Sequence, residues 1–430
     1  MIKIFFTFVF SLTLNIVSAH YYIKSIPDSV NYQNQFDFET IPTVNRLQDF
    51  QFQWEFDEQI YDLISQVNID SLEYYVQTLQ NFGTRFYPTT TCIEAQNWIN
   101  EHFEKYNYDT ELHTFYIHPG YLCPSKNVIA VKQGTTNPEQ VVVCGSHYDS
   151  LTLSSFYNPN APAPGADDNA TGTAGMMEIA RLLSEFDLGR TIIICAFTAE
   201  ELGLYGSNEF ASRCRQQKMD IIGYFNIDMS GYLHPGHAPH THVIFPESAR
   251  PLYNFYQTTT NMYIPEFEVS EGVFTGGDSD HTSFNKNGYM GIFPFEDEDK
   301  DYYSPYIHTI NDVIGLSVNS FEQVKLFTQA TLASVASMAS DNYNVNIENN
   351  QISNYITIVP NPASSYFRIY ARENINKIEI FNQLGQIVFS KLIENNNNVE
   401  IDTSQIIEGL YFVSIYNNNQ IITKKVIISK

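Results

Sequence analysis

The stretch Val141-Val142-Val143-Cys144-Gly145-Ser146-His147-Tyr148-Asp149-Ser150 sets a histidine and an aspartate at the end of a short apolar run. An apolar run of this length, bounded by a glycine, is typical of a buried strand. Open α/β sheets carry their sites outside the carboxyl ends of their strands, which is where this pair would lie. A His-x-Asp pair alone is a weak signal, so the rest of the chain decides its meaning.

Four further segments carry metal-ligand side chains, each after an apolar run or in a turn. They are Gly165-Ala166-Asp167-Asp168-Asn169, Thr198-Ala199-Glu200-Glu201, Asn226-Ile227-Asp228 and Tyr306-Ile307-His308-Thr309. Imidazoles and carboxylates without thiolates are typical of catalytic zinc. Two zinc ions about 3.5–4 Å apart would share one carboxylate and leave room for a bridging hydroxide as nucleophile. The pattern therefore predicts a di-zinc site.

The same residues have simpler structural explanations. An Asp or Asn before the helix expected at 172–183 would cap it, so we expect Asp167 to face metal while Asn169 or Thr171 caps. The Glu200-Glu201 pair could merely favour a helix N-terminus. Because it follows the apolar run 192–197, we interpret it as catalytic: one glutamate binds metal, and Glu200 is the general base that passes a proton to the leaving amine.

Other histidines and Asp149 complete the candidate set. Asp149 would accept a hydrogen bond from His147 and fix its tautomer. His281 and His308 compete for the last ligand position, and spacing does not separate them. A second group, His234, His237, His240 and His242, could suggest further metal. Pro235, Gly236 and Pro239 favour a solvated loop there instead.

Strand and helix patterns alternate through the middle of the chain and indicate a layered α/β domain. The ranges are 127–131, 141–144, 172–183, 191–197 and 207–213, with two helices before them and a last one at 321–338. We divide the chain into a signal peptide at 1–19, an N-terminal arm or short pro-segment at 20–56, a catalytic domain at 57–343, a linker at 344–351 and an all-β sandwich at 352–430.

Charge and cysteines limit the function and the compartment. The formal net charge of −25 excludes a nucleic-acid role, because phosphate binding needs a basic surface. No stretch after residues 1–19 is long and apolar enough to span a membrane, so we expect a secreted chain. Of five cysteines, Cys144 and Cys195 lie in apolar runs; Cys92 and Cys123 are the expected disulfide, leaving Cys214 free.

The motifs His147-Tyr148-Asp149, Pro164 to Ala170, Ala199 to Gly203, Asn226 to Met229, Ser279-Asp280-His281 and Pro305 to Thr309 resemble the secreted bacterial leucine aminopeptidases and their co-catalytic zinc exopeptidase family. The resemblance covers about residues 57–340. It implies a three-layer α/β/α domain with a mixed central sheet, and a substrate that is a peptide with a free N-terminus.

The resemblance also implies roles for single residues. Asp167 would bridge two zinc ions, with Glu201 and His308 completing one and His147 and Asp228 the other, which leaves His281 beside the ligands. It implies a cis peptide between Asp167 and Asp168. The pocket for the N-terminal side chain would be lined by Met229, Phe295, Tyr303 and Ile307.

Two departures from the family pattern stand out. In the family, a tyrosine that helps to stabilise the tetrahedral intermediate would fall near Gly276, where this chain has no tyrosine. Another donor or the metal must therefore stabilise the oxyanion. The segment from Glu296 to Asp301 is more acidic than the family pattern. A preference for leucine is therefore in question, and basic N-terminal residues are an alternative.

The tail resembles the C-terminal sorting domain of type IX secretion cargo. The resemblance rests on Val359-Pro360-Asn361-Pro362-Ala363, Ile378 to Gln386, Gly409 to Val413 and Lys424 to Ile428. It implies contact with the type IX secretion machinery, and a protein that is secreted or attached to the cell surface at the outer membrane. A carbohydrate-binding sandwich would show an aromatic platform, which the sequence lacks.

Two other functions compete with the di-zinc aminopeptidase. Glutaminyl cyclases, acyltransferases that use one zinc, resemble the chain at His147 to Ser150 and at the paired glutamates, but they usually lack the second carboxylate that follows Ala166-Asp167. A non-catalytic surface protein with a degenerate peptidase domain would have lost ligands, and none is missing from the sequence.

Overall fold

The computed structural model describes residues 56–117, 124–273, 278–340, 356–382, 386–416 and 421–430. The predicted signal peptide, the arm up to residue 55 and the linker therefore lie outside the described residues. The chain divides into two compact units, Met1–Val345 and Asn346–Lys430, and each is described by itself.

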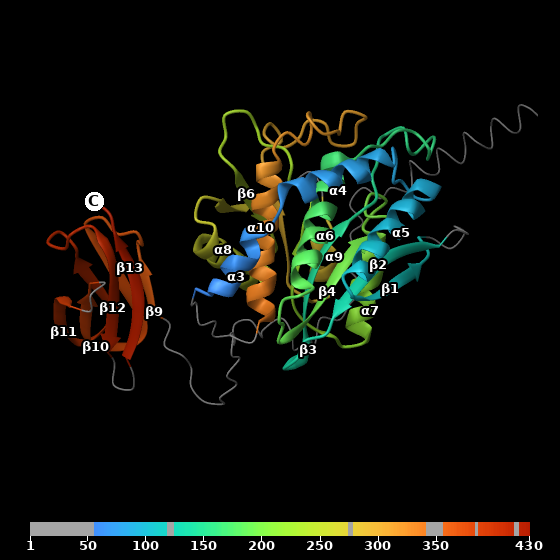
Figure 1. The fold of residues 1–430 in the computed structure, drawn as a ribbon. Coiled ribbons are helices and arrows are strands. Elements are labelled where there is room, and N and C mark those ends of the chain that lie inside the picture. Colours follow the sequence, from blue (N-terminus) through green and yellow to red (C-terminus); the bar gives the residue numbers. More distant parts are fainter. Residues whose placement is uncertain (1–55, 118–123, 274–277, 341–355, 383–385, 417–420) are drawn as a thin grey trace, which may run out of the picture. The chain divides into compact units, whose positions relative to one another are not determined.

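The first unit combines helices and strands, as Figure 1 shows. Its α-helices are α3 (Glu58–Ser65), α4 (Ile69–Asn81), α5 (Thr90–Lys105), α6 (Gly172–Leu183), α7 (Tyr205–Gln216), α8 (Arg250–Tyr263), α9 (His281–Lys286) and α10 (Phe321–Ala339). Its strands are β1 (Asp109–Phe115), β2 (Ser125–Lys132), β3 (Asn137–His147), β4 (Arg190–Phe197), β5 (Asp220–Asn226), β6 (His240–Ile244), β7 (Glu268–Gly272) and β8 (Gly291–Phe295). Two short turns, η1 (Ala166–Thr171) and η2 (Glu247–Ala249), precede α6 and α8.

The strands form one mixed sheet in the order β1-β2-β4-β3-β5-β8-β6-β7. The central strands β4, β3, β5 and β8 run parallel to one another, while β1 and β2 pair antiparallel, as do β2 and β4, and β6 and β8. The mixed central sheet expected from the family resemblance is confirmed. Parallel neighbours bring their carboxyl ends to the same edge, so residues that follow β3, β4 and β5 meet there.

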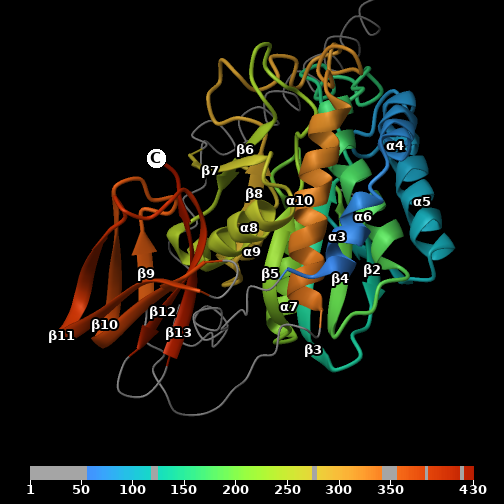
Figure 2. The same ribbon diagram turned by 60° about the vertical axis from the view of Figure 1, so that its left-hand side comes forward.

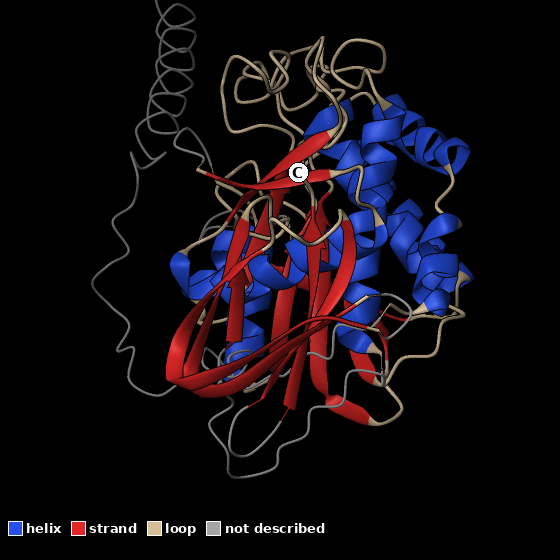
Figure 3. Ribbon diagram, turned by 90° about the vertical axis from the view of Figure 1, so that its left-hand side faces the viewer, coloured by secondary structure: helices blue, strands red, loops and turns tan. Residues whose placement is uncertain are grey.

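Two hydrophobic cores cover the two faces of this sheet. Val142 and Cys144 of β3 pack with helices α4, α5, α6, α8 and α10, whereas Val141 and Val143 pack with side chains of α7 and α9. Side chains alternate across a strand, so an unbroken apolar run supplies both cores at once. Figure 2 shows α10 and α6 over one face, and Figure 3 distinguishes the strands in red from the helices in blue. This is the predicted three-layer arrangement.

Local sequence signals explain most helix starts. Asp57 accepts a hydrogen bond from Gln59 N at the start of α3, and Ser320 accepts one from Gln323 N at the start of α10. The N-cap of α4 is Asn68, whose side chain accepts a hydrogen bond from Ser71 N.

The second unit is the predicted all-β unit. Its strands are β9 (Ile356–Val359), β10 (Tyr366–Phe381), β11 (Ile387–Asp402), β12 (Gly409–Tyr416) and β13 (Ile421–Ile428). They form an antiparallel sheet in the order β11-β10-β12-β13, with β9 on the first half of β10. The register shifts between Tyr370 and Ile375, and the buried core draws on both halves of β10, including Phe367 and Ile380.

Membrane and cysteine features were searched in the described residues alone. Among them, no helix is both long enough and apolar enough to cross a bilayer. Cys144, Cys195 and Cys214 are buried free thiols. Cys92 is also a buried free thiol, 3.8 Å from Thr198 Oγ1, and its predicted partner Cys123 lies outside the described residues.

Candidate active site

The predicted ligands gather at the carboxyl edge of the parallel strands. His147 is the last residue of β3, Glu200 and Glu201 follow β4, and Asp228 follows β5 by two residues. His308 comes from the long segment between β8 and α10. Segments more than 150 residues apart in sequence, from His147 to His308, therefore converge on one edge of the sheet.

Two groups of potential ligand atoms share one carboxylate. The first group is His147, Asp168 and Asp228, and the second is Asp168, Glu201 and His308; within each, the ligand atoms lie within 4.8 Å of one another. His147 Nε2 is 3.4 Å from Asp168 Oδ1 and 3.4 Å from Asp228 Oδ1. His308 Nε2 is 3.0 Å from Asp168 Oδ2 and 3.0 Å from Glu201 Oε2. The two oxygens of Asp168 thus face the two groups separately.

The structure corrects the predicted position of the shared carboxylate. Asp167, the predicted bridge, turns away: its Oδ1 accepts hydrogen bonds from Gly231 N at 2.8 Å and Thr171 Oγ1 at 3.2 Å. The backbone departs from helical geometry at Asp168, with φ −103° and ψ 89°, which directs the second carboxylate to the ligands. The cis peptide is likewise one residue later than predicted, between Asp168 and Asn169.

The capping prediction for this turn is confirmed at Asn169, whose Oδ1 accepts a hydrogen bond from Gly172 N at 2.9 Å. Gly165 starts the turn with φ +51°, and a Cβ there would lie 2.5 Å from Ser150 Cβ. Glycine is therefore required by both conformation and space. Ala199, Met229 and His308, each a ligand or within two residues of one, also have positive φ. Strained backbone of this kind concentrates at functional sites.

The donor set fits a pair of divalent cations. Glu201 Oε1 and Asp228 Oδ1 are buried and accept no hydrogen bond from any described residue. Buried carboxylate oxygens are normally satisfied, so atoms left without donors call for a cation or water. The other oxygen of Asp228 accepts from Ser279 Oγ at 2.7 Å, and Asn226 Nδ2 holds that hydroxyl at 2.7 Å. Each group combines one imidazole with carboxylates, a mixture that suits zinc.

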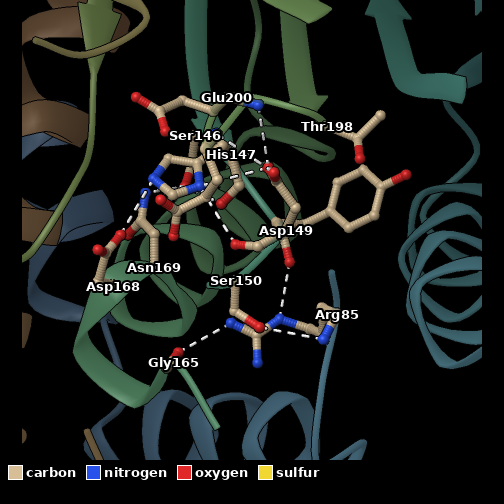
Figure 4. A network of polar contacts seen from close by, with 12 residues as sticks. Arg85, Ser146, His147, Asp149, Ser150, Gly165, Asp168, Asn169, Thr198 and Glu200 are labelled. Carbon is tan, nitrogen blue, oxygen red and sulfur yellow. Dashed lines mark hydrogen bonds and ion pairs between the residues drawn. The ribbon is translucent and has the colours of Figure 1, made fainter. Parts of the chain in front are cut away.

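Asp149 connects His147 to the segment that carries the paired glutamates, and Figure 4 shows it between His147 and Glu200. Its Oδ1 lies 3.5 Å from His147 Nδ1. Its two oxygens also accept the backbone N–H groups of Glu200 and Glu201, each at 3.3 Å. The buried aspartate therefore both faces the ring nitrogen opposite the ligand atom and fixes the start of the segment after β4.

Charges in the cluster shift one another's pKa values. Burial opposes a charge on His147, but the carboxylates of Asp228 and Glu200 outweigh it and raise the pKa of His147 well above its ordinary value. Burial likewise opposes ionisation of Asp168, yet hydrogen bonds from His147 and His308 hold its pKa well below normal. Desolvation raises the pKa of Glu200 well above normal, although His147 lowers it in part. Metal binding at this site must displace the imidazole protons.

Two positioning residues carried no recognisable signal in the sequence. Arg85 is fully buried and donates to the carbonyl oxygens of Tyr148, Pro164 and Gly165 at 2.7–2.8 Å, which ties two ligand-bearing loops together (Figure 4). Asp312 accepts the backbone N–H groups of Asp167 and Asp168 at 2.8 and 3.1 Å. Both act on backbone atoms far away in sequence, a relation that side-chain patterns do not reveal.

The four predicted pocket residues lie in one apolar cluster. Met229, Phe295, Tyr303 and Ile307 pack together with Phe293 and Ile244, which sequence reasoning had not selected. The rings of Phe295 and Tyr303 are 5.6 Å apart. Met229 follows Asp228 and Ile307 precedes His308, so this apolar cluster adjoins both ligand groups.

The remaining predictions have mixed outcomes. His308 joins the ligand groups, whereas His281 is buried and 5.4 Å from the ring of Phe293, outside both groups. The position of the absent tyrosine, Gly276, lies outside the described residues. In the acidic segment, Glu296 is buried and accepts the backbone N–H groups of Tyr232 and Ser304.

Known proteins resemble both units. Residues 127–331 match the model of peptidase family M28, and residues 357–429 match that of the secretion system C-terminal sorting domain. Leucine aminopeptidase 1 of Fusarium vanettenii is 30% identical over 292 residues, which cover 65% of this chain and 72% of that protein. The crystal structure of the LapA aminopeptidase of Legionella pneumophila superposes with a TM-score of 0.59 at 25% identity, covering 67% of this chain and 77% of that one.

A glutaminyl cyclase of Bacteroides thetaiotaomicron shares the fold, with a TM-score of 0.53 at 19% identity over 63% of this chain and 98% of that one. Its likeness concerns the fold alone. The family model and the fungal relative point to the same family, and the order of the ligands along the chain is consistent with it. The chain belongs to peptidase family M28, a family of zinc peptidases.

Proposed function

We propose that this zinc aminopeptidase binds two zinc ions and removes residues one at a time from the free N-terminus of peptides. The observation that carries the proposal is the position of Asp168 between two ligand groups. His147 and Asp228 would complete the first site, and Glu201 and His308 the second. A carboxylate whose two oxygens face different histidines is suited to join two cations.

Zinc bound there would polarise the carbonyl of the scissile peptide bond and make a water molecule more acidic. The chain itself supplies the proton transfer. Glu200, raised in pKa by burial, would take the proton from the attacking water and deliver it to the leaving amine. Asp149 holds the backbone N–H of Glu200, so the base is fixed relative to the ligands.

The apolar cluster of Met229, Phe293, Phe295, Tyr303, Ile307 and Ile244 would receive the side chain of the N-terminal residue. Two of its members, Met229 and Ile307, adjoin the ligands Asp228 and His308 in sequence, which supports this role. Apolar lining with few polar groups favours apolar or aromatic N-terminal residues over charged ones. The buried carboxylate of Glu296 is occupied by backbone donors, which argues against a preference for basic residues.

The C-terminal unit is a secretion sorting domain, which indicates secretion or attachment to the outer surface of the cell. We propose that the type IX machinery recognises it, after a signal peptide at residues 1–19 has directed export. The domain boundaries at 57–343 and 352–430 belong to the same proposal.

The test is mass spectrometry of a peptide mixture with free and acetylated N-termini, some beginning with glutamine. A ladder of products from free N-termini alone is the expected result. Loss of ammonia from glutamine peptides without shortening would make the protein a cyclase. No change in any peptide, with zinc present and the chain folded, would support a non-catalytic surface protein.

A further inference from the structure

A second group of histidines lies outside the catalytic ligands. His234 and His237 belong to the loop before β6. His240 and His242 lie two residues apart on β6, so their side chains share one face of the strand. The ring centroids of successive members are 4.8, 5.7 and 5.3 Å apart. The sequence favoured a solvated loop here, yet three potential ligands, His237, His240 and Asp297, bring their ligand atoms within 4.8 Å of one another.

Strand pairing explains how the aspartate reaches this loop. β6 pairs antiparallel with β8, with His242 opposite Phe295. Carried two residues further, this register sets His240 opposite Asp297, on the same face of the sheet. Asp297 is 4% exposed, and the ion pairs recorded for it among the described residues are those with His240 and His242.

The hydrogen bonds of His240 leave a place for a cation. Its Nδ1 lies 2.9 Å from the carbonyl oxygen of Ala238, an acceptor, so Nδ1 carries a proton. In the neutral ring, Nε2 then presents a lone pair to Asp297 Oδ2, also 2.9 Å away. Two acceptors at that distance require a proton or a metal ion between them. A ring that donates Nδ1–H to a backbone carbonyl has the orientation common among zinc-binding histidines.

Neighbouring nitrogens add further potential ligands. The Nδ1 atoms of His234 and His242 are buried and make no hydrogen bond to any described residue. His242 Nδ1 lies 3.9 Å from Asp297 Oδ1 and 3.6 Å from Glu298 Oε1. Buried ring nitrogens without a hydrogen bond are unusual and point toward the binding of an ion or water.

We propose that His237, His240 and Asp297 form a separate site for a divalent transition metal ion, with zinc as the best-suited ion. Two imidazoles and one carboxylate favour zinc and its neighbours over calcium or magnesium, which prefer oxygen ligands. The site does not depend on the catalytic centre. Ile244 and Phe295 of the apolar cluster lie on β6 and β8, so the ion would tie the 234–240 segment to the residues that follow β8, beside that cluster.

The test is the number of zinc ions bound per full-length chain, measured by elemental mass spectrometry after equilibrium dialysis against zinc. We expect His237→Ala and Asp297→Asn each to hold one ion fewer than the unaltered chain. Asp301→Asn is the matched control, because it removes the same charge from an exposed position four residues away, and it should keep the full zinc content. The comparison is a difference between chains with intact catalytic ligands, so it holds whatever number of ions the catalytic centre binds.

A thermal unfolding curve separates the loss of a metal ligand from the loss of the fold. His237 is exposed, so His237→Ala should unfold at the same temperature as the unaltered chain in the absence of zinc. Added zinc should raise the unfolding temperature of His237→Ala less than that of the unaltered chain. Equal zinc content in the unaltered chain and in a folded His237→Ala variant would overturn the proposal.

Discussion

Oδ2 of Asp168 lies 3.0 Å from Nε2 of His308. The other oxygen of the same carboxylate faces His147, so one aspartate serves both ligand groups. Asp168→Asn should therefore lose both of the zinc ions proposed for the catalytic site, since an amide offers one oxygen instead of two. Asp167→Asn is the matched control and should keep them, because burial and the nearby Glu296 raise the pKa of Asp167 and an amide resembles its uncharged form.

Zinc per chain, measured after dialysis, checks this pair of variants. Loss of zinc from Asp167→Asn together with its retention in Asp168→Asn would restore the bridge that the sequence had suggested. Circular dichroism of both variants separates a lost ligand from a lost fold.

The choice between these neighbouring aspartates could not be made from the sequence. Side-chain direction in a turn depends on backbone angles, and the non-helical conformation at Asp168 decides which carboxylate meets the histidines. The strands were predictable because unbroken apolar runs such as 141–144 must be buried on both faces. The ligands at their ends followed from that rule, which is why His147, Glu201 and Asp228 converge as expected.

Glu200→Gln should keep zinc and lose turnover. Glu200 belongs to neither ligand group, so metal content should not change. Removal of a general base lowers kcat by about 10²–10⁴-fold, while KM changes little because the amide keeps the size of the side chain. Steady-state kinetics on a peptide with a free N-terminus measures both constants. Full activity in the zinc-loaded variant would assign the proton transfer to another group.

Asp149→Asn tests a positioning role. The amide still accepts one backbone N–H but offers an N–H₂ group where the second oxygen stood, so either Glu200 N or Glu201 N loses its acceptor. Loss of such a supporting contact should cost about 10–100-fold in zinc affinity or activity. Zinc titration together with kcat and KM distinguishes the two effects. A variant with unaltered affinity and unaltered kcat would show that Asp149 is not needed for alignment.

We expect the preference for the size of the N-terminal residue to depend on Ile307, which packs in the apolar cluster and precedes His308 in sequence. Ile307→Ala enlarges the space and should shift the ratio of kcat/KM toward peptides that begin with bulky residues, by about tenfold. Ile310→Ala is the control, because this residue is 62% exposed and lies three positions later. An equal shift in both variants, or none in Ile307→Ala, would place the specificity elsewhere.

The second histidine group shows where sequence reasoning had least to work with. Pro235, Gly236 and Pro239 do mark a loop, as predicted, and His237 is exposed. The buried partner, Asp297, lies 57 residues beyond His240 and reaches it only through the pairing of β6 with β8. A β6–β8 pairing was not derivable from the short and irregular apolar patterns of those segments.

Acid should destabilise the catalytic unit through those buried histidines whose pKa burial lowers, among them His102. Burial lowers the pKa of His102 to about 4, although its Nε2 donates to Met177 O at 2.9 Å. The unfolded chain, with an ordinary pKa near 6.5, binds a proton that the folded chain refuses between about pH 6.5 and pH 4. The stability that His102 contributes is therefore fully present above pH 6.5 and is lost as the pH drops toward 4, with a loss of about 2 kcal/mol at pH 5.

His102→Gln isolates this contribution, because the amide can still donate to Met177 O but does not titrate in this range. Unfolding by urea at pH 7 and at pH 5 should show a smaller loss of stability in the variant than in the unaltered chain. Part of the acid effect should remain, since burial also lowers the pKa of His113 to about 4. An identical loss between the two pH values in both chains would show that His102 is protonated as readily in the folded protein as in the unfolded one.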